Sequence, residues 1–144
     1  MMMYKAARQV LERALVCRLG IVCDGRPYVV PVCFCAYEGA LYFHSRTHGK
    51  KMDCIDANPQ VCFEVDIDHE LRKGRDPCNW SMKFKSIVGE GRATRCDDAS
   101  EKEDALKALV KKYGGREPHV FAPEALESVA VVRIDIDDMR LRIN

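Results

Sequence analysis

Two short turns that contain glycine, each between strand-like segments, constrain the fold of this chain most. Residues 26–37, rich in Val, Phe and Tyr, are followed by Glu38-Gly39 and then by the apolar residues 40–45. Asp24-Gly25 separates the same segment from the short apolar stretch 17–23. Glycine supplies the positive φ that a tight hairpin connection requires. The sequence therefore predicts three antiparallel strands joined by two hairpins.

The rest of the chain adds further strands with helices between them. Residue patterns and end signals predict helices over residues 4–16, 50–58 and 97–113 and strands over 60–67, 80–94 and 128–137. Loops are expected over 68–79 and 116–127, the second with room for one helical turn. Gly89 and Gly91 are expected to mark a bend or bulge in the long strand. This order favours a mainly β fold: a small barrel of about six antiparallel strands with peripheral helices. Residues 1–144 are expected to form one domain.

Composition excludes several classes of protein. Of the 144 residues, 47% are hydrophobic, which is enough for a real core and rules out disorder. The apolar runs are shorter than a membrane span, and Lys5, Arg8 and Glu12 interrupt the apolar start as they would not in a signal peptide. The formal net charge of +1 gives no general basic field for nucleic acid. We therefore expect a cytoplasmic protein that binds neither membrane nor nucleic acid.

The eight cysteines are predicted to be reduced thiols that pack as small apolar side chains. Most of them lie within apolar strand patterns, and no Cys-x-x-Cys pair is present. Cys33 and Cys35 would lie on one face of a strand. A redox or metal role is the less favoured alternative, and no metal site is predicted because no consistent ligand spacing is found.

Residues with phosphate-binding chemistry gather between the strand at 40–45 and the helix at 50–58. His44-Ser45 ends the strand, and Lys50-Lys51 begins the helix after a short polar loop. A helix N-terminus offers unpaired N–H groups and a partial positive charge, to which the lysines add full charges. A lone lysine pair is more often only solvated, but this convergence favours a phosphate ligand. Arg46 is a third candidate cation.

These segments resemble a known family. RLGIV, CDGRPYVVPVCF, EGALYFHS and GKKMDCIDANPQVCFEVD, together with NWSMKFKSIVGEGRA, resemble the FMN-binding split-barrel proteins related to pyridoxamine 5′-phosphate oxidase. The nitroimidazole-reductase branch looks nearest. The likeness covers roughly residues 16–115. Members of that branch often carry extra residues before the first helix, so a ligand contact from such an arm is expected to be missing or different here.

The resemblance implies a homodimer with two FMN sites at the subunit interface, and it implies which residues contact the flavin. On the ring and ribityl side it places Pro31, Val32, Cys33, Phe34, His44 and Ser45. Lys50 and Lys51 would reach the phosphate. Lys85 and Ser86 would contribute from the long strand, and Trp80 would close the pocket from the other subunit.

The activity implied is flavin-dependent reduction of a small organic molecule, with a nitroimidazole as the best single substrate and a nicotinamide cofactor as a possible electron donor. His44 is the candidate catalytic residue, because imidazole can donate protons near neutral pH; a hydrogen-bonded structural histidine is about equally favoured. The alternatives are a non-catalytic flavin-binding, storage or sensor protein, and a haem-binding member of the same fold. Pyridoxamine phosphate oxidation is less favoured, because an arginine-rich segment near the C-terminus is not found.

Overall fold

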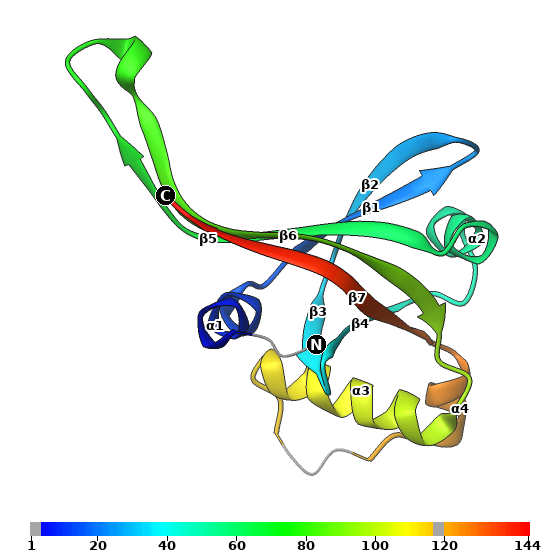
Figure 1. The fold of residues 1–144 in the computed structure, drawn as a ribbon. Coiled ribbons are helices and arrows are strands. Elements are labelled where there is room, and N and C mark those ends of the chain that lie inside the picture. The colour runs from blue at the N-terminus through cyan, green and yellow to red at the C-terminus, as the bar shows by residue number, and fades with distance from the viewer. Residues whose placement is uncertain (1–3, 117–119) are drawn as a thin grey trace.

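The computed structural model describes residues 4–116 and 120–144, which form a seven-stranded antiparallel sheet with helices on its outside. The strand order is β2-β1-β5-β6-β7-β4-β3 (Figure 1). The helices are α1 (Lys5–Arg13), α2 (Lys50–Ala57), α3 (Ala99–Lys112) and α4 (Pro123–Glu127), with a short 3-10 helix, η1 (Pro77–Asn79). The strands are β1 (Cys17–Cys23), β2 (Arg26–Val32), β3 (Phe34–Tyr37), β4 (Ala40–Ser45), β5 (Gln60–Arg72), β6 (Ser81–Arg95) and β7 (Ala130–Ile143).

The sheet curls back on itself because its two edge strands follow each other in the chain. Only Cys33 separates β2, which pairs with β1, from β3, which pairs with β4. The single strand predicted over residues 26–37 is therefore divided, and the sheet has seven strands rather than about six. The mainly β split-barrel architecture is confirmed.

The Tyr113 hydroxyl fixes the crossover at Cys33, where the chain passes from β2 at one sheet edge to β3 at the other. It accepts a hydrogen bond from the Phe34 N–H at 3.0 Å and lies 2.7 Å from the Leu15 carbonyl oxygen, to which it donates. Tyr113 directly follows α3, so the hydroxyl ties that helix to the edge of the sheet and to the segment between α1 and β1. A buried backbone N–H needs an acceptor, and here a side chain provides it.

Two apolar clusters lie on opposite faces of the curled sheet. The larger fills the barrel and includes Leu11 from α1, Phe34, Phe43 and Phe63. The smaller lies under α3, where Tyr42 and Val131 pack against Ala105, Leu106 and Leu109. The helix predicted at 97–113 is confirmed, and the Asp98 side chain caps it by accepting from the Glu101 N–H at 3.2 Å.

The β5–β6 hairpin continues well beyond the barrel as an arm (Figure 1). The loop predicted over residues 68–79 is wrong in its first part, because β5 runs to Arg72, opposite Ser81. The register of β5 against β6 shifts between Ile67 and Glu70, where Asp68 has a φ of 58°. Strand pairing resumes after this bulge, and the polar sequence gives no signal for it. The bulge expected near Gly89 and Gly91 is present, between Glu90 and Gly91.

Cys23 and Cys54 form a disulfide, which overturns the prediction that all eight cysteines are reduced. Their Cα atoms are 5.1 Å apart because α2 packs against the end of β1, but the 31-residue separation gives no sequence signal. Cys17 and Cys35 are buried as predicted, and burial raises their pKa values to about 12 and about 11. Cys33, Cys62 and Cys78 are exposed, so they are not core residues.

None of the helices within residues 4–116 and 120–144 has both the length and the apolar character needed to cross a membrane.

The disulfide predicts a thiol count that can be measured. Protein purified without reductant and unfolded in guanidinium should give six thiols per chain with a thiol reagent, and eight after reduction. Cys54→Ser should lower the free energy of unfolding by roughly 3–4 kcal/mol, because an unfolded chain of that loop length gains freedom without the cross-link. Eight thiols before reduction would contradict the bond.

Candidate functional site

The end of β4 and the start of α2 share a hollow of about 480 Å³. Its wall includes His44, Ser45 and Lys51, three residues predicted to contact a ligand, and also Arg46 and His48. Ser128 and Val129 complete the wall. Sequence reasoning missed these two, because they reach the hollow only through the pairing of β4 with β7, in which Ser45 lies opposite Ala130.

The N-terminus of α2 presents donors that no side chain caps. Its N-cap is Gly49, with a φ of 127° that favours glycine, and no side chain accepts a hydrogen bond there. The first N–H groups of a helix are without helical partners and carry the positive end of the helix dipole. Asp53 adds one negative charge in the first turn, against the cations of Arg46, Lys50 and Lys51. This corner therefore suits an anion.

The two lysines of the pair have different surroundings. Lys51 is half-buried and lines the hollow, with its Nζ 5.8 Å from the centroid of the Phe43 ring, and burial lowers its pKa. Lys50 is exposed and does not line the hollow; its Nζ lies 4.1 Å from the centroid of the Tyr28 ring on β2. A partly desolvated ammonium gains most from an anionic partner. Lys51 is therefore the stronger candidate for a direct contact.

Arg95, at the end of β6, holds the loop between β4 and α2. Its Nε and Nη2 each donate to the Asp56 carboxylate at 2.9 Å, and its Nη1 donates to the Thr47 carbonyl oxygen at 2.8 Å. The hydrogen bonds from Arg95 lower the pKa of Asp56. Sequence reasoning missed Arg95, because 39 residues separate it from Asp56 and no local pattern marks it.

The segment Pro31–Phe34 comes close to this corner through the sheet. Val32 and Phe34 point into the barrel, whereas Pro31 and Cys33 are exposed. Because Phe34 lies opposite Phe43, the chain at Cys33 enters the sheet at the level of His44. The crossover between the sheet edges and the cationic corner are thus neighbours, although Pro31–Phe34 does not line the hollow itself.

Three predicted contact residues lie far from the hollow within one chain. Trp80 lies near the tip of the arm, where its Nε1 donates to the Gly74 carbonyl oxygen at 2.9 Å. Lys85 pairs with Asp68 at 3.5 Å, and Ser86 is buried. Lys85 precedes Arg95 by ten residues of β6, about 30 Å in an extended strand. Within one chain these residues do not reach the hollow, so their role in binding a ligand remains a prediction.

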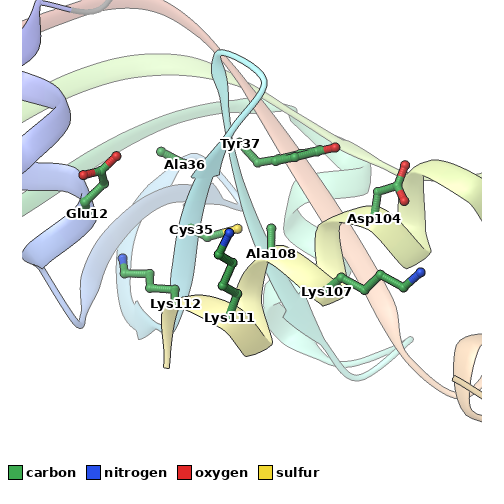
Figure 2. Close-up of a pocket in the computed structure, with 9 residues that line it drawn as sticks. All are labelled: Glu12, Cys35, Ala36, Tyr37, Asp104, Lys107, Ala108, Lys111 and Lys112. Carbon is green, nitrogen blue, oxygen red and sulfur yellow. The ribbon is translucent and has the colours of Figure 1, made fainter. Parts of the chain in front are cut away.

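A larger hollow of about 570 Å³ lies between α1, β3 and α3 (Figure 2). Its three lysines do not converge on one point, and Glu12 and Asp104 lie among them. Lys112 donates to the Leu11 carbonyl oxygen at 3.1 Å and lies 3.5 Å from the centroid of the Phe34 ring. Burial lowers its pKa to about 8. Lys112 therefore joins α1 to α3, and its ammonium is directed at these partners within the chain.

Glu64 and Asp66 form a carboxylate pair whose pKa values are shifted in opposite directions. Burial and the neighbouring Asp66 raise the pKa of Glu64 to about 7. Arg18 Nη1 lies 3.5 Å from the Asp66 carboxylate, and His69 Nε2 lies 2.8 Å from it. The pair therefore has ionic partners within the chain. It lies on the outside of β5, away from the cationic corner.

Comparison with known proteins agrees with this architecture. A family model described as pyridoxamine 5′-phosphate oxidase matches residues 5–143. A candidate 5-nitroimidazole antibiotic resistance protein from Bacteroides thetaiotaomicron has a similar structure, with 28% identity over 96% of this chain and 82% of that chain, and a TM-score of 0.82.

Two further solved structures show the same fold. An FAD-binding protein from Mesorhizobium loti is 30% identical over 95% of this chain and 92% of its own, with a TM-score of 0.66. An FAD- and haem-binding protein from Mycobacterium smegmatis is 17% identical over 100% of this chain and 72% of its own, with a TM-score of 0.89. A search of curated protein sequences found no match. From the family match over nearly its whole length, this chain belongs to the pyridoxamine 5′-phosphate oxidase family of split-barrel proteins.

Proposed function

We propose that this protein is an FMN-dependent oxidoreductase that works as a homodimer and reduces small nitroaromatic compounds. The observation that carries the proposal is the corner where Lys51, His44, Ser45 and the uncapped end of α2 meet around one hollow. These are the positions that the family resemblance assigns to the flavin and its phosphate.

The residues at the corner fit a phosphate monoester. The dianion gains from the α2 dipole and from the Lys51 ammonium, and Ser45 and His44 add donors. A half-buried lysine strengthens such an interaction, because less water screens it. FMN carries a terminal phosphate of this kind, whereas riboflavin has only a hydroxyl. Discrimination between these two flavins therefore reports on this corner directly.

Bound FMN would supply two-electron redox chemistry at its ring, while the protein binds, orients and shields it. In the proposal, the backbone of Pro31–Phe34 lies along that ring, and Tyr113 holds the backbone in place through Phe34. His44 lies at the same end of β4 and serves as a proton donor to the substrate. The likeness to a candidate 5-nitroimidazole resistance protein favours a nitroimidazole as substrate.

A second copy is proposed to complete the site. The outer face of β1 and β2 carries the apolar side chains Val22 and Val29, which are 37% and 63% exposed. Val88, 54% exposed, lies on β6 beyond the charged cluster of Arg18, Glu64 and Asp66. A hollow of about 450 Å³ lies on this face, and Glu90 and Asp137 are at its side. An apolar surface with a charged border is typical of an interface. The exposed basic residues Arg72, Lys73 and Arg75 of the arm complement those acids.

Activity tests the proposed function. The protein reconstituted with FMN should consume NADH or NADPH and bleach the nitro absorbance of a 5-nitroimidazole in the absence of oxygen, at a rate well above that of free FMN. His44→Gln should lower the rate at saturating FMN about a hundredfold, because the glutamine amide can still donate a hydrogen bond but cannot transfer a proton near neutral pH. Tight FMN binding without turnover would instead indicate a storage or sensor protein, and a Soret band would indicate haem.

Lys51→Ala should weaken FMN binding about tenfold or more, because a charge-assisted hydrogen bond to the phosphate is lost. Riboflavin affinity should change less than twofold. Flavin fluorescence titration gives both dissociation constants. Lys50→Ala should have a smaller effect, and Lys111→Ala, on exposed α3 surface, should have none. An unchanged FMN affinity for Lys51→Ala would remove this lysine from the site.

Val29→Asp tests the second copy. A carboxylate on this apolar face should convert a dimer into monomers and weaken FMN binding, since the partner would no longer supply its residues. Sedimentation velocity measures the first effect and flavin titration the second. Val120→Asp, at an exposed position beside α4, is the control. A wild-type protein that sediments as a monomer would refute the interface.

A further inference from the structure

Arg95, at the end of β6, is hydrogen-bonded to two segments of the proposed phosphate corner. Three of its nitrogen atoms are engaged: Nε and Nη2 with the two Asp56 oxygens at 2.9 Å each, and Nη1 with the Thr47 carbonyl oxygen at 2.8 Å. Asp56 lies in the last turn of α2, and Thr47 lies in the loop before it. The guanidinium thus joins a residue that precedes Gly49, Lys50 and Lys51 in the chain to one that follows them.

The loop that Arg95 holds has little else to fix it. Residues 46–49 are exposed, and Gly49 has backbone freedom that other residues lack. Within the described part of the chain, the other side-chain contact of Thr47 is with its neighbour, where Thr47 Oγ1 lies 3.2 Å from His48 Nδ1. The body of α2 is anchored separately, through buried Met52 and Ile55 and the Cys23–Cys54 disulfide. Loss of Arg95 should therefore free the loop while α2 stays in place.

We propose that Arg95 is a positioning residue, which presets the loop and the first turn of α2 for a phosphate group without contacting that group. This inference rests on the proposed function. Arg95 is not placed to bind the phosphate itself, because it does not line the hollow and three of its five N–H donors are taken by its carboxylate and carbonyl partners. Its rigid planar fork suits such a bridge, and a lysine has no second arm with which to reach both partners. The effect on a ligand is indirect: an ordered loop binds with less loss of conformational freedom.

The test compares FMN with riboflavin, which differ only in the phosphate. For Arg95→Ala, FMN affinity should fall about tenfold, and riboflavin affinity should change less than twofold. Arg95→Lys should not restore FMN affinity, and Asp56→Asn should reproduce part of the loss. Arg92→Ala is the matched control, because Arg92 is exposed on the same strand and makes no salt bridge within residues 4–116 and 120–144. Its affinities should equal those of the wild type.

Hydrogen exchange gives a second readout that does not need flavin. Peptides that cover residues 46–51 should exchange faster in Arg95→Ala, with exchange in the core of β5 and β6 unchanged. Equal losses for both flavins, or faster exchange throughout the barrel, would make Arg95 merely structural and overturn the inference. A normal FMN preference in Arg95→Ala would overturn it as well.

Failure of the proposed function would look different. A wild-type protein that binds FMN no better than riboflavin would refute the phosphate corner, and the inference with it. A wild-type preference that Lys51→Ala abolishes and Arg95→Ala leaves intact would refute the inference alone. If Arg95→Ala does not fold, Asp56→Asn decides the question, since it weakens the same bridge from the partner side.

Discussion

The passage of the chain from one sheet edge to the other at Cys33 is the constraint on which the rest of this structure depends. One residue links two edge strands that pair with different neighbours, so the sheet must curl. The Tyr113 hydroxyl holds this point by accepting from the Phe34 N–H. The β3–β4 hairpin then brings the end of β4 beside this point, because Phe34 lies opposite Phe43, and His44 comes to lie next to the segment that the family resemblance assigns to the flavin ring.

The corner at α2 combines two kinds of support that act on different parts. Apolar packing of Met52 and Ile55, with the disulfide at Cys54, fixes the body of the helix. A polar bridge from Arg95 fixes the loop in front of it. The division fits the proposed phosphate site, because the first turn has no side-chain cap and its N–H groups are left open.

One chain carries only part of the proposed site. The hollow at His44 and Lys51 opens to solvent, while Trp80, Lys85 and Ser86 lie along an arm that leads away from it. An arm of this kind has few contacts with its own barrel, and its exposed basic residues lie far from the acidic side of the apolar outer face. The proposed second copy would use both surfaces and would cover the apolar side chains on that face.

The sequence by itself determined the local elements and the chemistry of the corner. The turns at Asp24-Gly25 and Glu38-Gly39, the cap at Asp98 and the grouping of His44-Ser45 before Lys50-Lys51 are local signals, so short-range patterns are enough to find them. The division at Cys33, the extension of the arm past Asp68, the Cys23–Cys54 bond and the bridge from Arg95 were decided only by the tertiary structure. Each of these depends on which segments pair across tens of residues, and a periodic pattern along the chain contains no information about its distant partner.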